Sequence, residues 1–214
     1  MTKIIAIDGP ASVGKSTLAK KISKKFKAPV LYSGKLYRAL ALEVIKRKIN
    51  FNKTEEILKC ITYIDLDNLS SAELYSSEVD NISSIISAKE QVRNELIAFQ
   101  RSFPKKYGDN IKFAIIEGRD IGTIIFPKAN YKIFLWAASE VRAKRRYEQL
   151  RNNGKNISYS KIFNEINVRD RKDMTRKIAP LMPAANSVLL DTTYIDIEQV
   201  FNAIKKIILR TKTI

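Results

Sequence analysis

The chain has 214 residues, 45% of them hydrophobic, which is enough to bury one sizeable core. Its 39 lysine and arginine residues against 22 acidic ones give a net charge of +17, so the partner could be a nucleic acid or a small anionic substrate. No apolar run approaches the roughly 20 residues of a membrane helix, and Cys60 is the single cysteine, so we expect a cytoplasmic protein without disulfides and without a membrane partner.

The first predicted strand, residues 3–8, leads into a glycine-rich loop and a helix over residues 15–27. The loop has the spacing of a P-loop, a glycine followed by four residues and then Gly-Lys-Ser. Its members are Gly9, Pro10, Ala11, Ser12, Val13, Gly14, Lys15, Ser16 and Thr17. The alternative is a glycine turn that happens to precede a helix starting with Lys-Ser.

This loop has the residue types that a nucleoside triphosphate requires. Gly9 and Gly14 allow backbone angles at which the amides face phosphate oxygens, and the following helix adds its positive end. Lys15 offers a charge to the β- and γ-phosphates, and the hydroxyl of Ser16 can bind Mg²⁺.

The next part of the chain is expected to form a short strand at 29–32 and a helix for which Ser33 is the candidate N-cap. Residues 50–87 show little periodicity, and we interpret them as a peripheral insertion with one short helix near 54–61. A long helix is predicted from 88 to about 107. It carries Arg93, for which the sequence leaves solvated surface and a site equally open.

Two further strands, 113–116 and 131–136, frame the segment 117–123, which is rich in glycine and charge. Such residues at the carboxyl end of a parallel strand lie where ligands bind in open α/β sheets. A helix starting at Ser139 or Glu140 then carries several basic residues and is stopped by Asn153-Gly154.

A helix from about 158 to 175 places Arg169, Asp173 and Arg176 at positions i, i+4 and i+7, which predicts one shared face. Two interpretations remain open. The three residues could form a ladder of weak surface ion pairs, or a clamp in which arginine forks bind phosphate beside a carboxylate. A last strand, 188–191, and an amphipathic helix complete the chain.

The alternation of elements predicts an α/β fold, a P-loop kinase-like five-stranded parallel sheet flanked by helices. The chain resembles the bacterial cytidylate kinases over nearly its whole length, because five sequence blocks occur in the order and spacing that are typical of that family. The blocks are 9–17, Ser33-Gly34-Lys35-Leu36-Tyr37-Arg38, Glu117-Gly118-Arg119-Asp120-Ile121-Gly122-Thr123, 169–176 and Ala179-Pro180-Leu181.

The resemblance implies transfer of the γ-phosphoryl group of ATP to CMP or dCMP with Mg²⁺. The residues that it assigns to the acceptor nucleotide are Ser33, Arg38, Ser84, Arg93, Arg119, Asp120, Arg169, Asp173 and Arg176. Among them Ser84, Arg169 and Asp173 resemble cytosine or sugar contacts. Arg38, Arg119 and Arg176 resemble phosphate or sugar contacts, and Arg142 and Arg146 resemble residues on the ATP side of a lid.

The resemblance also implies one kinase domain over 1–214. Its core is predicted at 1–48, 108–152 and 181–214, with an acceptor-binding region at 33–107 and a lid at about 153–180. The chain departs from the family in three places: Tyr32 stands where the family usually has Asp, Ser12-Val13 replaces Gly-Ser, and the insertion is short and without evident strands.

We expect catalysis to come from positioning and charge neutralisation, with Lys15, Arg119 and Arg176 as the catalytic residues. The chain has no histidine, and an acceptor phosphate oxygen is already anionic, so no general base is required. The alternatives are a kinase for UMP, AMP or shikimate, and a nucleic-acid-stimulated NTPase. A monomer without a nucleic-acid partner is expected.

Overall fold

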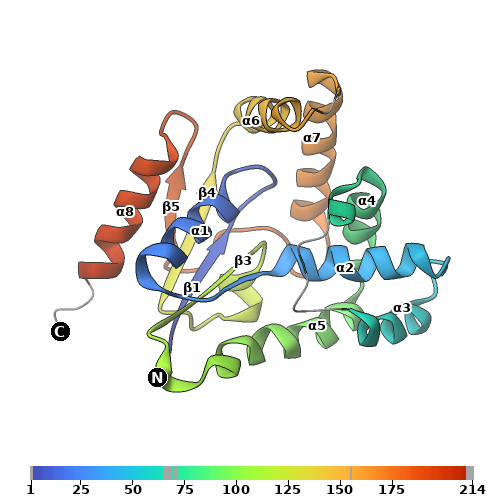
Figure 1. The fold of residues 1–214 in the computed structure, drawn as a ribbon, viewed down its shortest axis with the longest axis horizontal. Helices are drawn as coiled ribbons and strands as arrows, with labels where there is room; N and C mark the ends of the chain where they lie inside the picture. Colours follow the sequence, from blue (N-terminus) through green and yellow to red (C-terminus); the bar gives the residue numbers. More distant parts are fainter. Residues whose placement is uncertain (1, 65–68, 70–71, 155, 211–214) are drawn as a thin grey trace.

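The computed structural model describes residues 2–64, 69, 72–154 and 156–210. Residues 1, 65–68, 70–71, 155 and 211–214, which belong to the predicted core, insertion and lid, lie outside the described residues. Figure 1 shows the elements in space. They are β1 (Lys3–Asp8), α1 (Lys15–Phe26), β2 (Val30–Tyr32), α2 (Ser33–Lys46), α3 (Thr54–Cys60), α4 (Ser77–Ile86), α5 (Glu90–Ser102), β3 (Phe113–Gly118), β4 (Tyr131–Trp136), α6 (Ser139–Asn152), α7 (Tyr159–Thr175), β5 (Val188–Asp191) and α8 (Ile197–Arg210).

The five strands form one parallel sheet in the order β2-β3-β1-β4-β5, which confirms the predicted fold class. The strand that precedes the P-loop is therefore at the centre, with one neighbour on each side. Because the chain runs from β1 toward one edge and later returns to the other, the loops at the carboxyl end of β1 lie at a switch point of the topology.

Side chains alternate between the two faces of the sheet, as the pleat requires. Ile5 and Ile7 of β1 enter a core formed with α1 and α8, where Leu18 and Ile204 are fully buried. Ala6 points to the opposite core, which includes residues of α2 and the segment after α5. Helices thus cover both faces, and the apolar runs of the strands are buried on each side.

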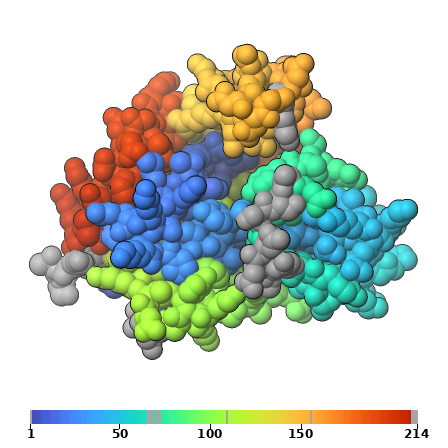
Figure 2. All heavy atoms as spheres, viewed as in Figure 1, coloured from blue at the N-terminus to red at the C-terminus, as the bar shows by residue number. Residues whose placement is uncertain are grey.

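Two smaller cores stand beside the sheet. Helices α2, α3, α4 and α5 share one of them, with Leu40, Ile57 and Leu96 at its centre. Helices α6 and α7 share the other, in which Ala143 packs with Ile162. In Figures 1 and 2 the lobe of α6 and α7 lies at the top in orange, and the lobe of α2 to α5 lies toward the right, in blue to green.

The structure corrects three predictions about helices. The long helix ends at Ser102, and residues 103–110 continue in 3₁₀ turns that begin at Phe103-Pro104. Helix α4 was not predicted, although Ser76 caps it by accepting a hydrogen bond from the Val79 amide. Ser33 is not an N-cap: it is the first residue of α2, and its side chain makes no capping bond.

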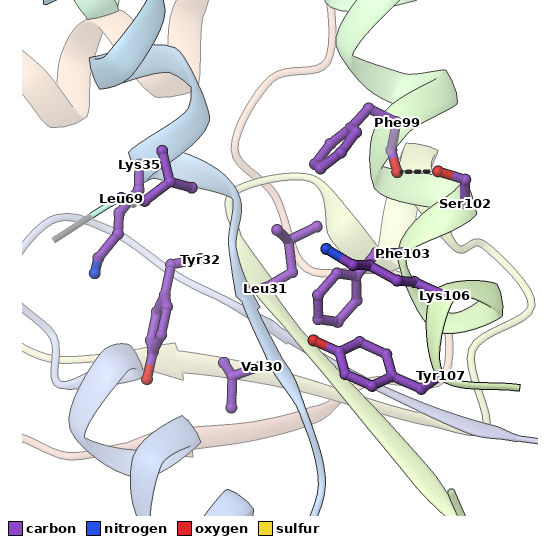
Figure 3. A pocket seen from close by; sticks show the side chains of 10 residues that line it. All are labelled: Val30, Leu31, Tyr32, Lys35, Leu69, Phe99, Ser102, Phe103, Lys106 and Tyr107. Carbon is purple, nitrogen blue, oxygen red and sulfur yellow. Dashed lines mark hydrogen bonds between the residues drawn. The ribbon is translucent and has the colours of Figure 1, made fainter. Parts of the chain in front are cut away.

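A cavity of about 310 Å³ opens at the β2 edge of the sheet (Figure 3). Its lining residues come mainly from β2, the start of α2, the end of α5 and the segment after it, with Tyr32, Phe99, Phe103 and Tyr107 as its aromatic members. The Lys35 ammonium lies 5.0 Å from the centre of the Tyr32 ring. No predicted site residue lines this cavity.

No helix within the described residues is long and apolar enough to cross a membrane.

Candidate active site

The register of the sheet brings the P-loop next to the segment that follows β3. Asp8 pairs with Gly118, and Glu117 is opposite both Ile7 of β1 and Tyr32 of β2. The carboxyl ends of the three adjacent strands β1, β2 and β3 therefore lie at the same edge of the sheet, where β1 and β3 continue into loops and β2 directly into α2. Most of the predicted site residues belong to elements that begin or end at this edge of the sheet.

The P-loop has backbone angles that explain its glycines. Gly9 has a φ of +148°, and a Cβ added there would be 2.4 Å from the Leu135 carbonyl oxygen, so only glycine fits. Gly14 has a φ of +99° and precedes the first residue of α1. Ser12, which replaces a family glycine, has a φ of +58°, so this loop holds one side chain in the left-handed region.

Lys15 is buried, and its ammonium group lies within the loop, where its Nζ donates to the Pro10 carbonyl oxygen at 2.7 Å. Burial, together with the charge of Arg119, lowers the pKa of Lys15 to about 7. Glu117, Asp8 and Asp173 favour the charged form of Lys15, but their effect does not offset burial. An anion at this point would restore its charge.

Two carboxylates that were not assigned from the sequence organise the loops around Lys15. Glu117 accepts a hydrogen bond from the Ser16 hydroxyl at 2.9 Å. Asp8 accepts from the amides of Ile121 and Gly122, at 2.8 and 2.7 Å, and so fixes the segment after β3 to the end of β1. Burial raises the pKa of Asp8 to about 7, against the effect of these two amides.

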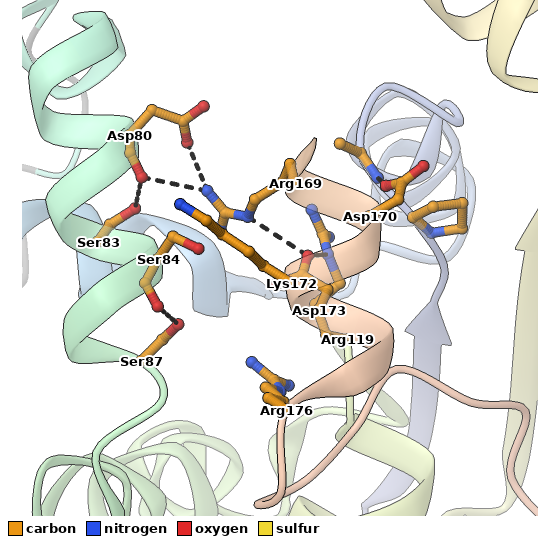
Figure 4. A network of polar contacts seen from close by, with 12 residues as sticks. Asp80, Ser83, Ser84, Ser87, Arg119, Arg169, Asp170, Lys172, Asp173 and Arg176 are labelled. Atoms are coloured by element: carbon orange, nitrogen blue, oxygen red, sulfur yellow. Dashed lines mark hydrogen bonds and ion pairs between the residues drawn. The ribbon is translucent and has the colours of Figure 1, made fainter. Parts of the chain in front are cut away.

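Five arginines gather opposite the P-loop, and we call them the arginine cluster: Arg38, Arg93, Arg119, Arg169 and Arg176. Three carboxylates pair with them, those of Asp80, Asp120 and Asp173. Figure 4 shows how α4 and α7 carry part of this network toward each other. The five guanidinium groups exceed the three carboxylates by two, so the cluster holds two positive charges that no carboxylate within it balances.

The innermost pair is Arg93 with Asp120. Arg93 is only 2% exposed, which excludes the interpretation of Arg93 as solvated surface. It binds the Asp120 carboxylate and donates to the Ser87 carbonyl oxygen at 3.1 Å. Arg176 lies 3.9 Å from Asp120, and its Nη2 atom is buried without a hydrogen-bond partner among the described residues. Burial raises the pKa of Asp120, although the surrounding arginines oppose this shift.

Asp173 joins two arginines from different parts of the chain. Arg119 donates to it at 2.9 Å and Arg169 at 3.4 Å. Burial alone would raise the pKa of Asp173, but these arginines hold it below its ordinary value. Asp173 is buried, so the interpretation as a surface ladder is wrong. The shared helix face is also only partly correct, because α7 ends at Thr175 and Arg176 has an extended backbone.

Arg142 and Arg146 of α6 have different surroundings. Arg142 is buried and binds Asp170 of α7 at 2.5 Å and the Ala11 carbonyl oxygen at 3.1 Å, while the Ala11 amide donates to Asp170 at 3.3 Å. This pair fastens α6 and α7 to the P-loop. Arg146 is partly exposed and donates to Gln149, and its charge acts on Arg38 of the cluster.

The remaining predicted residues lie around the cluster. Ser33 is buried, and its hydroxyl lies so close to Gly118 that a Cβ there would be 2.4 Å away. Ser84 is buried on α4, one turn after Asp80, on the side of the helix that Figure 4 shows facing α7. Asp80 lies outside every motif, and its partner Arg169 is 89 residues away. Asp170 lies within the block 169–176, but no role was predicted for it, and its contact with Ala11 spans 159 residues.

A P-loop at the centre of a parallel sheet, facing a cluster of arginines, defines the class of this protein: it is an α/β P-loop kinase. The family model described as cytidylate kinase matches residues 5–210, and this chain belongs to the cytidylate kinase family.

Individual relatives agree with this assignment. A cytidylate kinase from Fusobacterium nucleatum is 40% identical over 221 residues and 98% of each chain. One from Methylocella silvestris is 39% identical over 94% of this chain and 91% of its own. The solved structure of an uncharacterized protein from Eubacterium ventriosum has a TM-score of 0.57 at 14% identity, over 97% of this chain and 98% of that one, a likeness of fold.

Proposed function

We propose that this protein phosphorylates CMP and dCMP with ATP. The observation that carries the proposal is the charge of the arginine cluster. The cluster has two more guanidinium groups than carboxylates, which suits a phosphate monoester dianion, and Nη2 of Arg176 is a buried donor that such a phosphate would satisfy. Arg38, Arg93, Arg119 and Arg176 would then hold the acceptor phosphate opposite the P-loop.

The base and sugar of the acceptor are assigned to the side chains on the facing sides of α4 and α7 (Figure 4). Ser84, Arg169 and Asp173 offer there a hydroxyl, a guanidinium and a carboxylate. Cytosine presents an amino donor beside ring and carbonyl acceptors, so a mixed set of donors and acceptors suits it. Within the family to which the chain belongs, this set supports a pyrimidine monophosphate rather than a sugar acceptor.

The P-loop is assigned to the phosphates of ATP. Lys15 would exchange its hydrogen bond to the Pro10 carbonyl for a phosphate oxygen, and the added negative charge would raise the pKa of Lys15 and keep its proton in place. Transfer needs no general base, because the acceptor oxygen is an anion. The work of the chain is to align the two phosphates and to stabilise the charge on the group in transit.

The donor set beside the P-loop fits Mg²⁺. Ser16 and Glu117 supply a hydroxyl and a carboxylate, the hard oxygen ligands that this ion takes, and the described residues contain no cluster of three acidic, histidine or cysteine side chains that could hold a metal alone. Ser16 and Glu117 would hold the ion together with the phosphates of ATP. When bound, Mg²⁺ neutralises phosphate charge.

The proposal includes the division of the domain that the sequence predicts. Residues 33–107 would bind the acceptor, and 153–180 would act as the lid, with Arg142 and Arg146 on its ATP side. The acceptor region has a core of its own, shared by α2 to α5, whereas α7 of the proposed lid shares its core with α6. Closure of the lid over the nucleotides would exclude water and so prevent hydrolysis of ATP.

The test is a coupled assay of ADP release with CMP, dCMP, UMP, AMP, GMP and shikimate as acceptors. We expect CMP and dCMP to be preferred. A preference for AMP or shikimate would overturn the assignment of the acceptor. In the Asp173→Ala variant, kcat/KM should fall more for CMP and dCMP than for the poorer acceptors. An equal loss with every acceptor would contradict a role of Asp173 in recognition.

A further inference from the structure

Asp80 is the one carboxylate of the arginine cluster that neither the sequence motifs nor the family assignment places in the site. It lies on α4, an element that the sequence did not predict, and its carboxylate is 44% exposed. It nevertheless binds two members of the cluster at once. The Arg38 guanidinium is 2.5 Å from its Oδ1 atom, and that of Arg169 is 2.8 Å from the same atom.

These contacts join three helices. Arg38 comes from α2, Asp80 from α4 and Arg169 from α7, and Arg169 also donates to the Asp80 backbone carbonyl at 3.2 Å. Arg38 is held in addition by the Leu74 carbonyl oxygen at 2.9 Å. Asp80 is thus a bridge from the acceptor lobe to the helix that carries Asp173 (Figure 4).

The position of this bridge bears on recognition. The Arg169 guanidinium donates hydrogen bonds to Asp80 on one side and to Asp173 on the other, so its orientation is restricted. Ser84 is one turn from Asp80 on the same helix. The position of Arg169 therefore determines how Ser84, Arg169 and Asp173 are placed relative to one another.

We propose that Asp80 is a positioning residue of the acceptor site, which from α4 holds Arg38 of α2 and Arg169 of α7 in place before the nucleotide binds. Pre-arranging these forks lowers the ordering cost of binding. The inference rests on the proposed function, because it concerns the affinity for the acceptor nucleotide. Asp80 does not touch the reacting phosphates in this account, so it acts on binding and not on the transfer step.

The test compares Asp80→Asn with Glu78→Gln, which removes the same charge from an exposed position of the same helix. Titration calorimetry with CMP alone should give a Kd about tenfold higher for Asp80→Asn and an unchanged Kd for Glu78→Gln. In steady-state kinetics, KM for CMP should rise by the same factor while kcat and KM for ATP stay within about twofold.

A second measurement needs no nucleotide. Hydrogen exchange of the α7 amides should be faster in Asp80→Asn than in the wild type, and unchanged in Glu78→Gln, because α7 has lost the ion pair of Arg169 with the Asp80 carboxylate and keeps only weaker ties to α4. An unchanged Kd of Asp80→Asn for CMP overturns the proposal, whatever the exchange rate. So does tighter binding of CMP, which would make Asp80 a competitor for the arginines.

The two proposals fail in different ways. If the wild type phosphorylates no pyrimidine monophosphate, the proposed function is wrong, and the exchange of α7 still decides whether Asp80 holds the two lobes together. If the wild type is active on CMP and the Asp80→Asn variant binds it equally well, only the role of Asp80 is wrong.

Discussion

The pair formed by Arg142 and Asp170 offers the sharpest test of how the P-loop is held. The Asp170→Ala variant removes a carboxylate that accepts from the Arg142 guanidinium at 2.5 Å and from the Ala11 amide at 3.3 Å. The side chains of Arg142 and Asp170 are 2% and 9% exposed, so water cannot replace the lost partner. The variant therefore leaves a buried charge without its counter-ion.

The loss of stability depends on the hydrogen bonds that Arg142 retains in the Asp170→Ala variant. Breaking a buried ion pair costs about 3–5 kcal/mol. Arg142 retains hydrogen bonds to the carbonyl oxygens of Ala137 and Ala11, at 2.8 and 3.1 Å, so we expect a loss near the lower limit. A loss of about 3 kcal/mol in a chain of this size lowers the melting temperature by roughly 6–12 °C.

The assay is thermal unfolding followed by circular dichroism, with urea unfolding to give the free energy. Glu165→Ala is the matched control, because it removes an exposed carboxylate from the same helix and should change stability by less than about 0.5 kcal/mol. In the double variant Asp170→Ala/Arg142→Met much of the loss should be recovered, since no buried charge remains. Equal stability of Asp170→Ala and Glu165→Ala would refute the reasoning.

Three further predictions concern the P-loop. Lys15→Ala should lower turnover at least ~10²-fold through loss of one electrostatic stabiliser, and turnover near the wild-type value would contradict the assignment of the loop. Gly9→Ala should unfold at a lower urea concentration, because its Cβ would be 2.4 Å from the Leu135 oxygen; a wild-type midpoint would show that the loop can move aside. The pKa of Lys15 is about 7 in the folded protein and 10.5 ordinarily, so between these pH values the unfolded chain binds more protons, and the unfolding free energy of the wild type should rise with pH relative to Lys15→Met. A difference that stays flat from pH 7 to 10 would mean that folding leaves this pKa unchanged.

The strands were predictable because each is a short apolar run ending in charge or glycine. Helix α4 was not, because Ser77–Ile86 is rich in serine, asparagine and acidic residues, which have weak helix propensity. It is held by packing of Val79 and Ile86 against the core of the acceptor lobe, which a local pattern does not reveal. The α5 boundary was misplaced because the apolar stripe continues through Phe103, while Pro104 lies in the 3₁₀ turns that follow.

The arginines of the site could be found from motifs, but their partners could not. Arg93 gave no sign of its burial, because its partner Asp120 is 27 residues away. Asp80 and Asp170 are ordinary acidic residues of helices until α7 is placed beside α4 and the P-loop. The sequence does not show how close the two lobes lie to each other. This arrangement determines which carboxylates pair with the arginine cluster and how much positive charge remains for a substrate.

The central claim is that the arginine cluster takes a nucleotide phosphate and directs the γ-phosphoryl group of ATP to it. The most direct measurement follows the label from ATP carrying ³²P in the γ-position, with CMP present and with CMP replaced by RNA. We predict that the label appears in CDP, that little inorganic phosphate forms, and that RNA has no effect. Label released as inorganic phosphate, with RNA increasing the rate, would contradict the account and indicate a nucleic-acid-stimulated NTPase.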